Sequence, residues 1–290
     1  MSEPTATAEL LIISPREKEL GGFTVRRLLP FAQKRMVGPW IFFDHMGPAI
    51  FPAGQGVDVR PHPHINLATV TYLFNGEILH RDSLGSEQAI APGDINLMVA
   101  GKGIVHSERE RDEIRNRDHV LHGLQLWLAL PEEYEEVEPA FHHYPGSDIP
   151  SVEVDNVWVR VLIGEAYEVA SPVKTFAQTV YAEAEIPPDK SLELPEVEEC
   201  GVYVLQGQVE INGTPVGVNQ MAVTTQPGSK LLATTSARVA IIGGEKLGDR
   251  HIEWNFVSSD PARIEAAKQR WQAGEFPLVP GDEEERIPYP

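Results

Sequence analysis

The sequence predicts an all-β protein whose two halves resemble each other, each half forming a sandwich or a barrel. Short runs rich in β-branched and aromatic residues recur with turn residues about every eight to twelve positions, and no helical pattern separates them. The 24 Gly and 24 Pro residues are spread along the chain, which suits a fold with many turns. With 290 residues the chain is long enough for two domains with separate cores.

The chain begins with residues that we expect to be frayed (1–8), followed by short strands at 10–14 and 23–31. The apolar run 36–52 contains Gly and Pro at both ends, which predicts a buried strand that leads into an irregular loop. Asp44 and His45 lie at the end of that strand. We expect them to satisfy loop backbone groups, and a catalytic role is the alternative.

Two polar pairs bracket the next segment: His62 and His64 at one end, His106 and Glu108 at the other. Alternate side chains of a strand point to the same face, so each pair projects from one face. Between the pairs, Asn75-Gly76 separates two β-rich runs and is a strong hairpin signal, and further turns are expected at 83–86 and 91–94.

Hairpins return the chain to its starting neighbourhood, so the two polar pairs are expected to meet. The result would be three imidazoles and one carboxylate around one point, which suits a divalent metal with open coordination positions. Two alternatives remain, namely four residues that only hydrogen-bond inside a barrel and a closed structural zinc site.

The segment 119–131 predicts another strand, and 132–150 is acidic and contains Pro, which indicates a connection between domains. Within this segment, the side chains of the adjacent residues His142 and His143 point in different directions, so they make a poor ligand pair. His119 and His122 are three residues apart and face opposite sides of the strand. We expect both to be structural or exposed to solvent.

The second half repeats the first in one visible place: Tyr72–Gly76 and Tyr203–Gly207 share Tyr, an apolar residue, a polar residue and Gly at an offset of 131 residues. Residues 172–250 contain no His, however. If the halves are duplicates, only the first can hold a metal through this set of residues.

The end of the chain changes to a helical pattern. Asp260 is placed to cap a helix, Pro261 occupies its first position and Gly274 follows its last turn. The stripe Ile264, Ala267, Lys268 and Trp271 predicts an amphipathic helix that lies on a barrel. The acidic tail 280–290 is expected to pack loosely or to serve a partner.

Composition excludes some classes of function. The 24 Lys and Arg against 43 Asp and Glu give a net charge of −19, and an acidic surface disfavours direct binding of nucleic acid. The single Cys200 cannot form an intramolecular disulfide. No apolar run reaches the roughly 18 residues of a membrane helix, so we expect a soluble, cytoplasmic protein without membrane contact.

The spacing of Gly56, His62 and His64, followed by Pro92-Gly93 and His106, is similar to the two signatures of the cupin superfamily. The usual Glu after the second His is absent, and Glu108 would supply the carboxylate instead. With FDHMGP, HPH, TVTYLFNGE, HRDSLG, GKGIVHSE and LHGLQLWLALP, the chain resembles the pirin family. Many pirins continue HPH with Arg-Gly-Phe-Glu, where this chain has Ile65–Ala68, a change in the pocket wall.

The resemblance implies a bicupin, with two tandem jelly-roll β-barrels and a C-terminal helix. Residues 1–146 would form the metal-binding N-terminal barrel, and 147–290 a C-terminal barrel without metal ligands, together with the helix and tail. It also implies one iron per chain, held by residues that match His62, His64, His106 and Glu108. This ligand set suits Fe(II), Mn, Co, Ni or Cu, with Zn as a further choice, better than Ca or Mg.

The first function that the resemblance implies is a quercetinase-like oxidoreductase. Such a metal-dependent dioxygenase would act on a flavonol-like hydroxylated aromatic, such as quercetin, with dioxygen as co-substrate. Glu108 would then be the catalytic base that takes the hydroxyl proton. The alternative is an iron-dependent, redox-responsive regulator that binds a protein partner without turnover.

Overall fold

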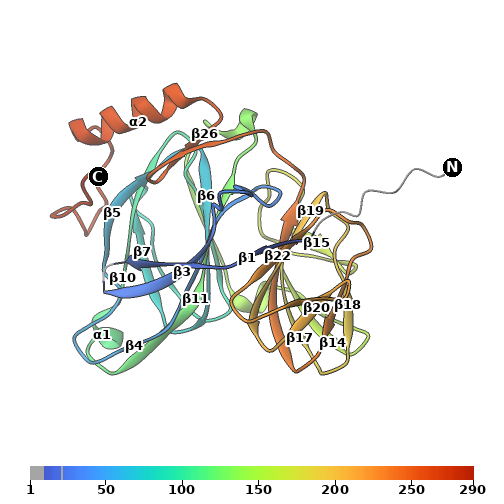
Figure 1. Cartoon of the computed structure of the whole chain (residues 1–290). Helices are drawn as coiled ribbons and strands as arrows, with labels where there is room; N and C mark the ends of the chain where they lie inside the picture. The colour runs from blue at the N-terminus through green and yellow to red at the C-terminus, as the bar shows by residue number, and fades with distance from the viewer. Residues whose placement is uncertain (1–9, 21) are drawn as a thin grey trace. The chain divides into compact units, whose positions relative to one another are not determined.

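A computed structural model describes residues 10–20 and 22–290, and most of its regular structure is β-strand (Figure 1). The start that we expected to be frayed, residues 1–8, lies outside the described residues. The chain forms two compact units. The first barrel comprises Arg16–Pro30, Trp40–Ile149 and Leu247–Pro290. The second barrel comprises residues 10–15, Phe31–Pro39 and Pro150–Lys246.

The first barrel has two antiparallel sheets and a separate hairpin. Its larger sheet has, in spatial order, β12 (Ala140–Tyr144), β9 (Ile95–Val99), β6 (Leu67–Asn75), β11 (His119–Ala129), β4 (Trp40–Phe51), β3 (Phe23–Leu29) and β2 (Arg16–Leu20). Its smaller sheet has β5 (Val59–His64), β10 (Ile104–Arg109), β7 (Ile78–Asp82) and β8 (Glu87–Ile90). The hairpin is β25 (His251–Glu253) with β26 (Phe256–Ser258), and the short helices are α1 (Asp112–Arg115), Glu132–Tyr134 and Gly146–Asp148.

The second barrel repeats this plan. Its larger sheet has β1 (Leu11–Ile13), β22 (Met221–Thr224), β19 (Glu199–Gln206), β24 (Ala237–Gly244), β17 (Thr179–Ile186), β14 (Val157–Ile163) and β13 (Ser151–Val154). Its smaller sheet has β18 (Ser191–Glu193), β23 (Lys230–Ala233), β20 (Val209–Ile211) and β21 (Thr214–Val216), and β15 (Glu165–Ala166) pairs with β16 (Val169–Ala170). Valine, leucine, isoleucine and alanine side chains fill its core.

The strand orders of the two barrels correspond, which confirms the internal repeat. From β9 to β2 and from β22 to β13 the larger sheets match strand for strand, and the smaller sheets match throughout. The edge position beside β9 is taken by β12, whereas the same position beside β22 is taken by β1 from the start of the chain. The counterpart of β10, which carries His106, is β23, and its sequence Lys-Leu-Leu-Ala has no imidazole or carboxylate. The second barrel therefore lacks this ligand set.

Three features of the structure differ from the sequence-based prediction of domains. Residues 247–290, which we placed with the second barrel, pack in the first, and residues 31–39 belong to the second. The connection expected at 132–150 was wrong in part, because residues 140–144 form strand β12 and pair with β9. Strand β12 is therefore part of the larger sheet of the first barrel. Its His143 side chain also forms a hydrogen bond with the Asn96 side chain of β9, at 2.6 Å.

The C-terminal helix α2 (Pro261–Ala273) confirms the predicted caps. Asp260 accepts a hydrogen bond from the Ala262 backbone N–H at 2.8 Å, and Gly274 has the left-handed conformation that ends the helix. The buried face of the helix carries Ile264, Ala267 and Trp271, and it packs against Ile65 and Val105 among other apolar residues of the first barrel. This apolar contact explains why the helix belongs to the first barrel.

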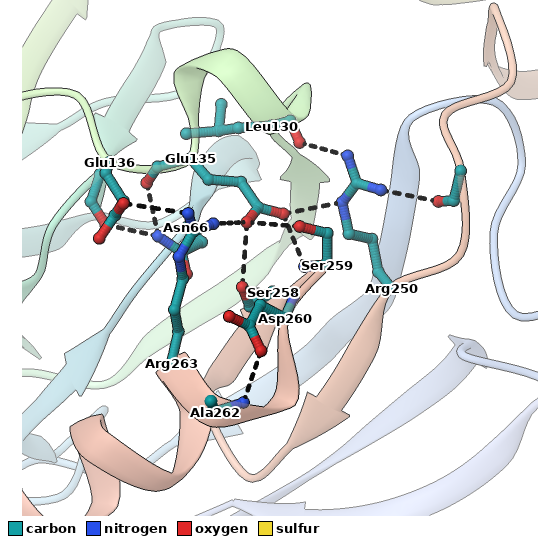
Figure 2. A network of polar contacts seen from close by, with 12 residues as sticks. Asn66, Leu130, Glu135, Glu136, Arg250, Ser258, Ser259, Asp260, Ala262 and Arg263 are labelled. Carbon is teal, nitrogen blue, oxygen red and sulfur yellow. Dashed lines mark hydrogen bonds and ion pairs between the residues drawn. The ribbon is translucent and has the colours of Figure 1, made fainter.

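A buried carboxylate, Glu135, fixes the C-terminal segment to the first barrel (Figure 2). It forms an ion pair with the Arg250 Nε at 3.0 Å and another with Arg263 at 2.6 Å. It also accepts hydrogen bonds from the Ser258 hydroxyl at 2.9 Å and from the Ser259 backbone N–H at 2.7 Å. These bonds hold the β25–β26 hairpin and the start of α2 in place.

The acidic tail is packed and not loose. The Trp271 Nε1–H donates to the Ile287 carbonyl at 3.0 Å, and the Ile287 N–H donates to the Pro61 carbonyl of β5 at 2.9 Å. Asp282 is paired with Arg109 of β10 at 2.8 Å. The tail therefore runs beside the two strands that carry the polar pairs. Within the described residues, no helix has the length and apolar character needed to cross a membrane.

Candidate metal centre

Three of the four predicted ligands meet inside the first barrel. His62 and His64 lie on β5 and His106 lies on the adjacent strand β10, where His106 is the register partner of His62. Their ring centroids are 4.4–5.1 Å apart, and one ring nitrogen from each comes within 4.8 Å of the others. All three rings are buried. The described part of the chain holds one such group of three.

The hydrogen bonds of the three rings leave their Nε2 atoms for a metal. The His62 Nδ1 is 2.9 Å from the Arg60 carbonyl, and the His64 Nδ1 is 3.1 Å from the Asn255 carbonyl, so each donates from Nδ1. The buried His106 Nε2 has no hydrogen-bond partner among the described residues. A buried polar atom without a partner is costly, and an imidazole with a bonded Nδ1–H is the common form of a metal ligand. These residues fit a transition metal.

Burial also sets the protonation that a metal requires. It lowers the pKa of His62 to about 4 and lowers the pKa of His64 and of His106 well below the ordinary 6.5, since a charged ring would lose its hydration. The neighbouring rings add to this effect for His64 and His106. All three imidazoles are therefore neutral at physiological pH and have a free lone pair.

Glu108, the fourth predicted ligand, lines the same cavity but is not part of the group of three rings. Burial raises the pKa of this carboxyl to about 7, and a hydrogen bond from the Gln125 side chain opposes part of that shift. The Gln125 oxygen accepts from the Thr71 hydroxyl at 3.1 Å, which directs the amide NH₂ toward Glu108. The carboxyl is thus poised between its two protonation states at neutral pH.

A cavity of about 420 Å³ opens beside His62 and His64 of the three-histidine group. Its wall includes His62, His64, Glu108 and Gln125, and the other lining residues are Leu20, Phe23, Arg27, Phe42, Asp44, Met46, Val57, Val59, Ile78, Trp127, Trp254, Asn255 and Ile287. Phe42 and Trp127 stack with centroids 4.0 Å apart and planes 10° apart, and the Trp127 ring meets His64 edge-on. The pocket therefore joins an aromatic wall to the candidate metal centre.

Asp44 and His45 do not bond loop backbone groups as predicted, because they lie within β4 and have side-chain partners. Arg27 donates two hydrogen bonds to the Asp44 carboxylate, at 2.8 and 2.7 Å, and its guanidinium lies over Phe42. The His45 Nε2 lies 2.8 Å from the His122 Nε2. His119 is paired with the Glu110 carboxylate at 3.1 Å, which also agrees with a structural role.

Sequence reasoning missed three groups at this site. Trp254 and Ile287 in the cavity wall, and the Asn255 carbonyl on His64, come from a segment that was assigned to the other barrel. No local signal marks them, because their role depends on how the C-terminal segment returns. The sequence also carried a signal for the buried pair His80 and Asp82 that the prediction did not use, because two polar residues at alternate strand positions repeat the pattern of His62 and His64.

Two family models match the chain: Pirin over residues 22–128 and the Pirin C-terminal cupin domain over residues 181–277. A pirin-like protein of Caulobacter vibrioides is 45% identical over 286 residues, which cover 97% of this chain and 99% of that protein. The chain belongs to the pirin family. The crystal structure of a quercetin 2,3-dioxygenase from Acinetobacter baumannii matches with a TM-score of 0.89 and 36% identity, covering 97% of this chain and 95% of that one.

A second quercetin 2,3-dioxygenase structure from the same organism matches with a TM-score of 0.86 and 25% identity, covering 93% of this chain and 99% of that one. The family and the two cupin domains that the sequence suggested are confirmed, and so is the all-β bicupin fold. For this pirin, the buried site of three histidines is the candidate for a divalent metal.

Proposed function

We propose that this pirin is a metal-dependent dioxygenase that acts on a flavonol-like hydroxylated aromatic, such as quercetin. The observation that carries the proposal is that two of the three neutral, buried imidazoles, His62 and His64, line a cavity of about 420 Å³ with an aromatic wall. The names of its structural relatives from Acinetobacter baumannii support the same substrate class.

We propose His62, His64 and His106 as metal ligands and Glu108 as the fourth. Nitrogen-rich sets of this kind favour Fe(II) and its first-row neighbours over Ca and Mg. When bound, such a metal supplies Lewis-acid and one-electron redox chemistry toward a phenolic oxygen and dioxygen. We expect one metal per chain, because the second barrel lacks the corresponding histidines.

The protein side of the reaction follows from the residues that line the cavity. Phe42 and Trp127 offer a flat apolar face on which an aromatic ring system can pack. Glu108, with a pKa of about 7, accepts the proton of the substrate hydroxyl on a carboxylate oxygen at neutral pH. Gln125 donates to that carboxylate and keeps it oriented. The burial of the site excludes water from the reacting groups.

The test is oxygen uptake with quercetin by iron-loaded protein, with metal content measured on the same samples. Wild type should consume oxygen, His62→Ala should lose both bound iron and uptake, and Glu108→Gln should lose uptake. His251→Ala is the matched control, since His251 is exposed on β25 and does not line the cavity. If wild type binds iron but consumes no oxygen, the proposal of a dioxygenase is overturned and the alternative of an iron-dependent regulator remains. A regulator would show an affinity for its protein partner that changes with the oxidation state of the iron.

A further inference from the structure

The strand β7 lies on the other side of β10 from β5, and it brings a second pair of polar residues to the metal centre. His80 and Asp82 project from β7, and Asp82 is the register partner of His106. Both side chains are buried, with 4% and 0% of their surfaces exposed. Neither belongs to the group of three imidazoles. A buried His–carboxylate pair therefore lies beside a candidate ligand.

The three side chains form a continuous series of contacts. The His80 Nε2 is 2.9 Å from one Asp82 oxygen, and the His80 Nδ1 is 3.4 Å from the His106 Nδ1. The other Asp82 oxygen accepts hydrogen bonds from the backbone N–H groups of Leu84 at 2.9 Å and Ser86 at 3.1 Å. The series ends at the His106 Nε2, which points to the candidate metal position without a partner.

Only one arrangement of protons satisfies this series with a metal on His106. A metal at Nε2 needs the lone pair there, so the His106 proton sits on Nδ1 and donates to the His80 Nδ1. The His80 Nδ1 must then be unprotonated, so the single proton of that ring sits on Nε2. That proton is donated to the Asp82 carboxylate, which can only accept.

Other contacts keep both members of the pair in position. The His80 ring stacks on Phe141 of β12, with centroids 4.2 Å apart and planes 14° apart. The turn after β7 fixes Asp82 through its two backbone hydrogen bonds. Neither side chain can rotate without losing buried contacts, so the direction of hydrogen bonding is set by the fold.

We propose that Asp82 and His80 are positioning residues that hold His106 in its metal-binding tautomer. The carboxylate orients His80, and His80 orients His106 with its Nε2 toward the ion. The inference rests on the proposed metal site but on no particular substrate or turnover. In other metal sites, loss of such a supporting residue weakens metal binding by about 10–100-fold.

The variant Asp82→Asn tests the direction of the hydrogen bonds. The Asn oxygen can keep the bonds from Leu84 and Ser86, but its NH₂ then faces the His80 Nε2 and can only donate. The His80 proton moves to Nδ1, and His106 avoids a clash of two N–H groups only by carrying its own proton on Nε2. That tautomer blocks the metal. A second variant, His80→Gln, removes the imidazole link.

The experiment measures the affinity of the full chain for Co²⁺ by competition with a chelating indicator, together with the visible spectrum at saturation. Asp82→Asn and His80→Gln should each weaken Co²⁺ binding by about 10–100-fold and shift the Co²⁺ absorption bands. In the His80→Gln background, Asp82→Asn should add no more than about twofold, because the link is already broken. The matched control is Glu110→Gln, which changes another buried His–carboxylate pair, His119–Glu110.

The outcomes separate the two proposals. If wild type binds no Co²⁺, the metal site itself fails and this inference fails with it. If wild type binds Co²⁺ and Asp82→Asn binds it with the same affinity and spectrum, the positioning role alone is overturned. Equal losses in Glu110→Gln and Asp82→Asn would also overturn it, because they would indicate general damage to the barrel. Thermal unfolding of each apo variant checks that the fold is kept.

Discussion

The pH dependence of metal affinity tests whether Glu108 is a ligand. Metal binding to a carboxylate must displace its proton, and the pKa of Glu108 is raised to about 7. The carboxyl is protonated below that pH in the metal-free fold, so protons compete with the metal there. His62, with a pKa lowered to about 4, is already neutral at pH 5 and gives almost no competition.

The magnitude follows from these values. Competition by one group with a pKa of about 7 weakens binding by about 100-fold at pH 5 relative to pH 8, or about 2.7 kcal/mol. In Glu108→Gln this dependence should vanish, and affinity should be nearly flat from pH 5 to pH 8. If the three imidazoles were exposed and had ordinary pKa values, each would instead weaken metal binding by about 30-fold at pH 5. Together they would weaken it by roughly 10⁴-fold.

The assay is Co²⁺ titration of wild type and Glu108→Gln against a competing indicator, in buffers that do not bind metal. Parallel pH profiles for the two proteins would refute Glu108 as a ligand while leaving the histidines in place. A loss near 10⁴-fold in Glu108→Gln would refute the conclusion that burial keeps the rings neutral. The control His251→Ala changes an exposed imidazole and should reproduce the wild-type profile.

Three further predictions concern the cavity, the C-terminal segment and the single thiol. Ile287→Ala should widen the cavity and change the KM for hydroxylated aromatics of different size without changing Co²⁺ affinity, whereas Leu278→Ala, on an exposed side chain, should change neither. Glu135→Ala leaves a buried arginine without its partner and should lower the free energy of unfolding by about 3–5 kcal/mol in denaturant titrations, against little change for exposed Glu133→Ala. Burial raises the pKa of Cys200 to about 12, so its thiol should not react at pH 8 in the native protein. A thiol reagent should therefore label no cysteine in the native protein and one per chain in denaturant. Rapid labelling of the native protein would contradict this prediction.

Local signals in the sequence predicted the elements well. The caps at Asp260 and Gly274 bound α2 as expected. Asn75-Gly76 does mark a turn between β6 and β7, but the hairpin predicted there was wrong, because β6 pairs with β9 and β11 in the larger sheet and β7 pairs with β8 and β10 in the smaller one. Alternation also placed His62 and His64 on one face of a strand. These signals succeed because turn conformation, capping and strand alternation depend on residues within a few positions of each other.

Contacts between distant segments could not be predicted in this way. The acidic composition of the tail indicated a loose end, yet Trp271 and Arg109 hold it against the first barrel. The segment 140–144 is short and polar enough to suit a linker, but the open edge of β9 offers it a ladder of backbone hydrogen bonds. In both cases the partner, and not the segment itself, decides the structure.

The candidate metal centre depends on both kinds of information. Strand alternation places His62 and His64 on one face of β5, and the pairing of β10 with β5 then brings His106 beside them. The carbonyl that orients His64 belongs to Asn255, 191 residues away, and it reaches the site because Glu135 holds the β25–β26 hairpin. Loss of the Glu135 contacts should therefore weaken metal binding as well as stability, through a residue that touches no ligand. The same Co²⁺ titration applied to Glu135→Ala, at a temperature where the variant remains folded, decides whether that coupling exists.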